Sequence, residues 1–236
     1  MEKTTVFNLI ILDESGSMGC LTRQTIDGCN ETINLIRSLH KKYGDTQHHL
    51  VSIYLFQTNA QIPSRYVCKN MPVEQVKNMD TDTYRPFGCT PLLDAVGSTL
   101  ADIRAVASTY EDATGIVTII TDGEENSSTD YTYEMVATMI SQLKELGWTF
   151  NFIGANIDVD MVAKKMKIDN TMAFHASEDG TADMWKTLGA NIIEHEDKRV
   201  RNEMANPSFS KKDKMEIRRK IAQKFFKKGA LFPNSN

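Results

Sequence analysis

Oxygen-bearing side chains occur in three short segments that could together bind a hard divalent cation. The segments are Asp13-Glu14-Ser15-Gly16-Ser17, Gly88-Cys89-Thr90-Pro91 and Thr121-Asp122-Gly123-Glu124. Mg²⁺ prefers about six oxygen ligands in near-octahedral geometry at roughly 2.1 Å, and it usually keeps several waters. The hydroxyl and carboxylate side chains that suit this requirement are those of Asp13, Ser15, Ser17, Thr90 and Asp122. Histidine and cysteine do not occur at zinc spacing, which argues against a zinc centre.

The spacing of the first segment favours convergence of its polar side chains. In an extended loop alternate side chains point the same way, so Asp13, Ser15 and Ser17 can face one cation, and Gly16 permits a tight turn. Each segment also has a simpler interpretation.

The two serines could merely cap a following helix, and Thr90-Pro91 has the form of an N-cap followed by proline at the first helical position. Asp122-Gly123 could be only a turn. The three segments together, each directly after a predicted strand or before a predicted helix, favour the metal site.

The elements that must position these side chains alternate between strand and helix. Residues 4–12 form a nearly continuous apolar run, which is typical of a strand covered by helices on both faces. Apolar residues then recur at spacings of three and four, which predicts a helix over 22–42. Further strands are expected at 49–56, 61–68, 115–121, 149–154 and 172–175, and further helices at 91–107, 133–146, 159–166 and 182–203.

This alternation predicts an α/β fold: a Rossmann-like, doubly wound, mostly parallel sheet with one antiparallel edge strand and helices on both faces. Ligands of such sheets bind beyond the carboxyl ends of the strands, near the point where strand order reverses. Asp13 and Asp122 each follow a predicted strand directly, so both are expected at that edge.

The motifs LDESGSM (12–18), GCTPLLDA (88–95) and TDGEEN (121–126) resemble the von Willebrand factor A domain family. In that family a metal-ion-dependent adhesion site is built from D-x-S-x-S, a distant threonine and a distant aspartate. The likeness extends over the strand and helix order of roughly residues 4–180. The segment GWTFNFIGANIDV (147–159) is similar to a compact prokaryotic or phage-type intracellular branch of the family.

The resemblance implies a role for each of the five residues. Ser15 and Ser17 would coordinate the metal directly, and Thr90 would do so directly or through water. Asp13 and Asp122 would act mostly through bound waters. The metal would be Mg²⁺, with Mn²⁺ or Ca²⁺ as alternatives, and one coordination position would stay open for a carboxylate of a partner protein. Asp94 is expected behind the ligands or near the start of its helix.

Composition and charge indicate an ordinary globular protein. The 236 residues are 41% hydrophobic and 25% charged, which suffices for one α/β domain with an appendage. We expect a von Willebrand factor A-type domain over 1–206 and a basic helical extension over 207–236. No run reaches the roughly 18 apolar residues of a membrane helix, and the first residues do not have the pattern of a secretory signal, so the cytoplasm is the expected location. The four cysteines are expected to be buried.

The basic extension offers an alternative function. Nine Lys/Arg residues in 207–236 against Asp213 and Glu216 give +7, which leaves −11 for the rest of the chain. Residues 210–228 place Ile217, Ile221 and Phe225 every four residues among cations, a pattern that fits binding to nucleic acid or an anionic surface. The acidic body is itself an available counter-surface, however, which favours a terminal helix that packs its apolar side chains on the body.

An enzyme of the haloacid dehalogenase phosphatase type is the third alternative, because Asp13 follows the first predicted strand. Such enzymes use a second aspartate two residues later as the acid, whereas this chain has Ser15, and no histidine accompanies the loop. The sequence therefore predicts a non-enzymatic, metal-dependent adaptor whose unidentified protein partner exposes an Asp or Glu.

Overall fold

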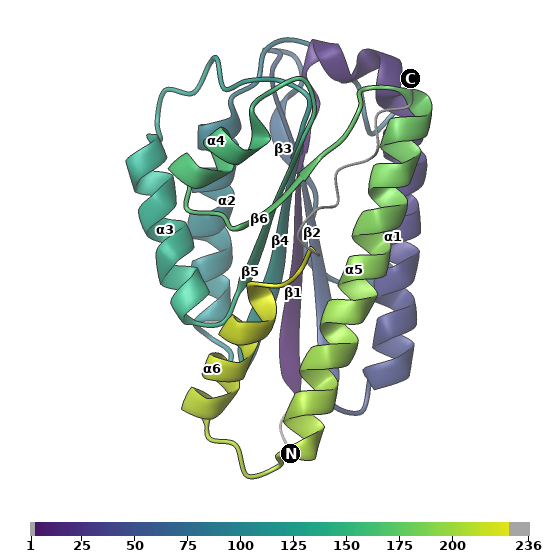
Figure 1. Ribbon diagram of the computed structural model, residues 1–236. Coiled ribbons are helices and arrows are strands. Elements are labelled where there is room, and N and C mark those ends of the chain that lie inside the picture. Colours follow the sequence, from purple (N-terminus) through teal and green to yellow (C-terminus); the bar gives the residue numbers. More distant parts are fainter. Residues whose placement is uncertain (1–2, 227–236) are drawn as a thin grey trace.

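A computed structural model describes residues 3–226, which form one six-stranded sheet with helices on both faces (Figure 1). The strands are β1 (Thr4–Asp13), β2 (Gln47–Thr58), β3 (Pro63–Pro72), β4 (Ala113–Thr121), β5 (Thr149–Gly154) and β6 (Asn170–Ala173). Their order is β3-β2-β1-β4-β5-β6, and only the β2/β3 pair is antiparallel. The predicted fold class and its antiparallel edge strand are confirmed.

Helices cover the two faces in separate groups. On one face lie α1 (Thr22–Tyr43) and α5 (Glu178–Ala205), and on the other lie α2 (Leu92–Ala107), α3 (Tyr133–Glu145) and α4 (Val159–Lys165) (Figure 1). Two short 3₁₀ helices, η1 (Gly16–Leu21) and η2 (Val73–Gln75), and a last helix α6 (Lys211–Ala222) complete the described chain.

The central position of β1 in the sheet explains why its residues do not alternate between apolar and polar. All ten of its residues are buried. Ile10 and Leu12 belong to the core under α1 and α5, whereas Leu9 and Ile11 belong to the core under α2 and α3. A strand in the middle of a doubly covered sheet needs apolar side chains on both faces.

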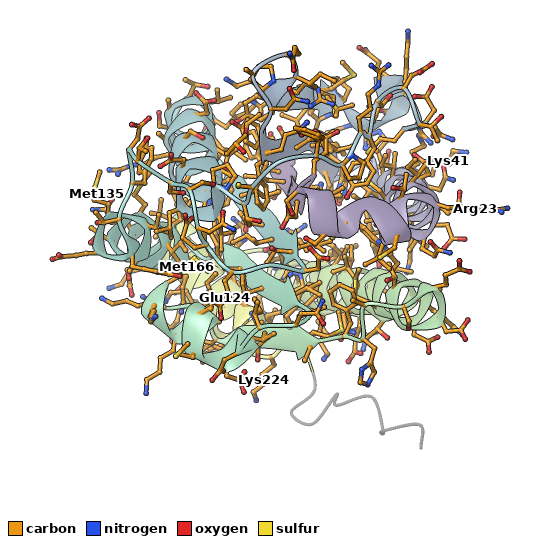
Figure 2. The ribbon with its side chains drawn as sticks, turned by 90° about the horizontal axis from the view of Figure 1, so that it is seen from above. Arg23, Lys41, Glu124, Met135, Met166 and Lys224 are labelled. Atoms are coloured by element: carbon orange, nitrogen blue, oxygen red, sulfur yellow. The ribbon has the colours of Figure 1, made fainter. Side chains whose placement is uncertain are left out.

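Strand order reverses between β1 and β4, and their carboxyl ends meet there. Leu12 pairs with Ile120, so Asp13 and Thr121 follow side by side at the edge of the sheet. β2 lies on one side of β1, and the later strand β4 lies on the other side. The carboxyl ends of β1 and β4 therefore form the switch point of the fold. Figure 2 looks down on this edge, where the labelled Glu124 marks the turn after β4.

The α6 helix packs against the body with a basic side chain inward. Arg218 is 2% exposed and pairs with Asp112 and with Glu203, each at 2.7 Å. Phe225 is buried as well, whereas Ile217 and Ile221 are only half-buried. The predicted segment 210–228 continues beyond the described residues at 227. Within the described part, no helix is long and apolar enough to cross a membrane.

The expectation about cysteines is wrong for two of the four. Cys29 and Cys68 are buried, but Cys20 and Cys89 are exposed, and all four are free thiols. Both exposed cysteines lie at the carboxyl edge of the sheet, Cys20 in η1 and Cys89 in the loop beside Thr90.

Candidate metal-binding site

Four of the five predicted ligands form one hydrogen-bonded cluster at the switch point. Ser17 Oγ donates to Asp122 Oδ1 at 2.6 Å and lies 3.2 Å from Ser15 Oγ. The Ser15 amide donates to Asp13 Oδ1 at 2.7 Å. The structure therefore brings together the first and third sequence segments, which are 105 residues apart between Ser17 and Asp122.

Thr90, from the second segment, reaches the same cluster. A Cβ atom added to Gly123 would lie 3.2 Å from Thr90 Oγ1 and 3.9 Å from Ser17 Oγ, so both hydroxyl groups border this glycine. The threonine backbone is tied to the turn after β4, because its amide donates to Asn126 Oδ1 at 2.9 Å. The hydroxyl groups of Thr90 and Ser17 therefore lie near the same point beside Gly123, which connects the second segment to the cluster.

The simpler interpretations of these residues do not hold. Ser15 occupies the N-cap position of η1 but makes no side-chain capping bond. The N-cap of α2 is Pro91 rather than Thr90, so the threonine hydroxyl does not cap the helix. Asp122 does more than shape a turn, since its carboxylate accepts the hydroxyl of Ser17.

The two carboxylates of the cluster, Asp13 and Asp122, are buried. Asp13 is 0% exposed, and its second oxygen accepts a hydrogen bond from Thr121 Oγ1 at 2.5 Å. Burial raises the pKa of Asp13 to about 6, although hydrogen bonds from Thr121 and Ser15 act in the opposite direction. Burial also raises the pKa of Asp122. A cation placed here would offset both effects, because an adjacent positive charge favours the ionised carboxylate.

The donor set fits a hard cation. Three hydroxyl groups and two carboxylates supply oxygen only, which is the ligand chemistry of Mg²⁺, Mn²⁺ and Ca²⁺. Among residues 3–226, no group of three or more His, Cys, Asp or Glu side chains comes together as a metal site. The hydroxyl-rich cluster has a different composition from such a site.

The sequence analysis assigned no ligand role to Glu14. In the structure its carboxylate holds together the segments that surround the cluster. It is 0% exposed, and its carboxylate pairs with Arg65 through two bonds of 2.6 and 3.0 Å. The same carboxylate accepts from Gln57 Nε2 at 2.7 Å and from the Arg85 amide at 2.6 Å. These contacts join the end of β1 to β2, to the edge strand β3 and to the long loop before α2. The only sequence signal was a carboxylate directly after a buried strand.

The turn after β4 is held by two further carboxylates. Asp94 accepts backbone amides of Thr129, Asp130 and Tyr131 at 2.8 to 2.9 Å. Glu125 accepts the Leu93 amide at 2.8 Å, at the start of α2. Asp94 therefore lies in the first turn of its helix, as expected, and its hydrogen bonds fix the loop rather than face the cluster.

The strand order β3-β2-β1-β4-β5-β6, with one antiparallel edge strand and helices on both faces, is a von Willebrand factor A-like fold. Solved structures with this fold include the pilus adhesin SpaC of Lactobacillus rhamnosus GG (13% identity, TM-score 0.59, covering 82% of this chain and 30% of that one). They also include proximal thread matrix protein 1 of the mussel byssus (13% identity, TM-score 0.56, covering 78% and 47%).

A further structure of the mussel protein is described as having a zinc-occupied metal-ion-dependent adhesion site motif (11% identity, TM-score 0.51, covering 79% and 45%). This chain spans less than half the length of each of these proteins. No protein-family model matches the sequence, and no curated protein is significantly similar to it. At these identities the likeness shows the fold alone.

Proposed function

We propose that this chain is a divalent-metal-dependent protein-binding module. Mg²⁺, or Mn²⁺ or Ca²⁺ in its place, would be held by Asp13, Ser15, Ser17, Thr90 and Asp122, and a carboxylate from a partner protein would complete its coordination. The observation that carries the proposal is the convergence of three segments, distant in sequence, into one oxygen-only cluster at the switch point. The metal would supply an electrophilic centre to which an anionic oxygen binds.

The geometry favours binding over catalysis. Asp13 is fully buried, and each of its two carboxylate oxygens accepts a hydrogen bond, from the Ser15 amide and from Thr121 Oγ1. A nucleophilic aspartate needs a free oxygen that can reach a substrate, together with a nearby acid. We therefore propose an adaptor and not a hydrolase.

The basic helix α6 gives less support to nucleic-acid binding. Lys214 and Arg218 pair with Asp112, and Arg219 pairs with Glu145. Cations that are engaged within the protein contribute less to an anionic surface than free ones. Nucleic-acid or anionic-surface binding through 210–228 thus stands as the second candidate. A cytoplasmic location and membership of the compact prokaryotic or phage-type branch remain parts of the proposal.

Metal titration of a serine variant tests the proposal. Wild-type protein should bind one equivalent of Mg²⁺ or Mn²⁺ in calorimetry, and Ser17→Ala should bind at least tenfold more weakly, because it loses a ligand at an exposed position where packing is unaffected. At 100 times Kd the metal should add about 2.7 kcal/mol to the free energy of unfolding of the wild type.

Ser108→Ala is the matched control. Ser108 is an exposed serine after α2 whose hydroxyl bonds only a backbone carbonyl. This variant should bind metal as the wild type does. Equal affinity of wild type and Ser17→Ala would refute the assigned site.

A further inference from the structure

Phe87 is an exposed aromatic side chain beside the candidate metal site. It is 61% exposed, three residues before Thr90. Its amide donates to the carbonyl of Glu14 at 2.8 Å, and the Gly16 amide donates to the carbonyl of Gly88 at 3.1 Å. The backbone around Phe87 therefore runs directly alongside the segment that carries Ser15.

The backbone on both sides of Phe87 is held by contacts to neighbouring segments. On one side the Arg85 amide donates to the buried carboxylate of Glu14 at 2.6 Å. On the other side Gly88 has a φ of +75°, and a Cβ there would lie 2.8 Å from Thr58 Oγ1, so a glycine is required. The Cys89 amide donates to the same threonine oxygen at 2.9 Å. The Phe87 side chain is therefore exposed to solvent, while backbone hydrogen bonds on both sides of it fix the loop.

Holding such a side chain in water has a cost that burial against a partner would offset. Aromatic residues near the centre of an interface commonly contribute a large share of the binding energy, and a preorganised backbone lowers the entropy lost on binding. Among the described residues, five other large apolar residues are exposed. Leu146 and Met204 lie toward the opposite edge of the sheet, where α3 and α5 end (Figure 1), Tyr110 follows α2, and Met135 and Met161 lie in the first turns of α3 and α4. Phe87 is distinguished from them by its place next to the cluster of oxygen ligands.

We propose that Phe87 is a second, apolar anchor of the metal-dependent binding surface, and that the partner is a peptide segment with an apolar side chain within about three residues of its coordinating Asp or Glu. Phe87 and Thr90 are three residues apart, which limits the separation of their Cα atoms to about 11 Å. An extended peptide covers that distance in about three residues. The inference rests on the proposed function, because the metal must first hold the acidic side chain.

Selection from a displayed library of random seven-residue peptides tests this inference. Peptides are bound to the Mg²⁺-loaded protein and released with chelator. Wild type and Met204→Ala should both enrich an acidic residue together with an apolar residue within three positions of it. Phe87→Ala should enrich the acidic residue alone. Met204 is a suitable control because it is 64% exposed and distant from the site.

The outcomes separate the two proposals. Enrichment of an acidic residue without an apolar neighbour by the wild type would overturn the role of Phe87 and leave the proposed function in place. Peptides that show no acidic preference, or that chelator does not release, would overturn the proposed function and this inference with it.

A quantitative measurement follows with one selected peptide. Its affinity for Phe87→Ala should be at least tenfold lower than for the wild type, while the Mn²⁺ affinity of the two proteins stays equal. An unchanged peptide affinity would overturn the inference. Equal metal affinity excludes misfolding of the site as the reason for lost binding.

Discussion

Adjacent carboxylates at the end of β1 have different roles because their surroundings differ. Asp13 accepts hydrogen bonds from Ser15 and from the Thr121 hydroxyl, and none of the described Lys, Arg or His side chains pairs with it, so its charge is not compensated within the protein. Glu14 is neutralised by Arg65, which binds both of its oxygens. A paired carboxylate has little to gain from a metal, which explains why the neighbouring acid is a structural group.

Thr90 provides a test at the scale of a single residue. Thr90→Ala should weaken Mg²⁺ or Mn²⁺ binding at least tenfold and lower the free energy of unfolding by less than about 1 kcal/mol, the typical contribution of an N-cap. The reason is that the N-cap of α2 is Pro91 and no side chain makes a capping bond there. Calorimetry and urea unfolding measure the two quantities.

Thr132→Ala is the matched control for this prediction. Thr132 caps α3 by accepting the Met135 amide. Its replacement should cost about 1 kcal/mol of stability and leave metal binding unchanged. If Thr90→Ala instead behaved like Thr132→Ala, the threonine would be a cap and not a ligand.

The edge strand β3 contributes to the site without a ligand of its own. Arg65 from this strand reaches Glu14, and its guanidinium also donates to the carbonyl of Thr83 at 2.6 Å. The loop between η2 and α2 is thereby fastened to the sheet. Tyr84 adds a second attachment, because its hydroxyl donates to the Asp13 carbonyl at 2.7 Å. The long loop can therefore place Thr90 although it has little regular structure.

Removal of Arg65 should show how much this attachment matters. Arg65→Met leaves the fully buried Glu14 without a counter-charge, and it should lower the free energy of unfolding by about 3 kcal/mol in urea titrations. Lys69→Met on the same strand should cost less than about 1 kcal/mol, because Lys69 and its partner Asp102 are both well exposed.

A double variant identifies the cause of the stability loss in Arg65→Met. Glu14→Gln combined with Arg65→Met removes the unpaired charge, so it should recover a large part of the lost stability. No recovery would mean that Arg65 acts through packing and not through its charge.

At the scale of the whole molecule, the two edges of the sheet have different chemistry. The carboxyl edge carries the oxygen cluster and the exposed Phe87. The amino-terminal part of the sheet carries a buried polar network in which His49 Nε2 lies 2.8 Å from Gln47 Oε1 and His49 Nδ1 lies 3.5 Å from Asn8 Nδ2. This network is distant from the proposed site and serves stability.

His49 should make global stability depend on pH. Burial lowers the pKa of His49 from 6.5 to about 4; the nearby charge of Glu196 acts in the opposite direction, and that of Arg199 adds to the lowering. Between these two values the unfolded chain binds more protons than the folded one, so stability falls as pH falls from about 6.5 to 4. The contribution of His49 to this loss is about 2 kcal/mol between pH 7 and pH 4.5.

Urea unfolding of wild type and His49→Asn across this pH range measures that contribution. The variant should be less stable than the wild type at pH 7, and the difference should shrink by about 2 kcal/mol at pH 4.5. Asp13 and all other groups titrate in both proteins, so their effects cancel. A difference that is constant with pH would show that His49 is not held neutral.

The strands, the helices and the five candidate ligands could be predicted from sequence, because each rests on a local pattern. Apolar runs specify doubly covered strands, spacings of three and four specify helices, and the parallel crossover rule places Asp13 and Asp122 at one edge. The segment after α5 was harder to predict. Its apolar spacing predicts that Ile217 and Ile221 face inward, yet both are only half-buried, whereas the basic Arg218 is buried because it pairs with Asp112 and Glu203.

Only the tertiary structure shows how the site is supported and which residues around it face solvent. Glu14 and Arg65 are 51 residues apart, and no local pattern relates them. The exposure of Phe87 and of Cys89 likewise depends on contacts that their loop makes with β1 and β2. The physical reason is that a ligand motif is a property of spacing along the chain, whereas the partners of a buried charge and the exposure of a loop depend on segments that meet only when the chain is folded.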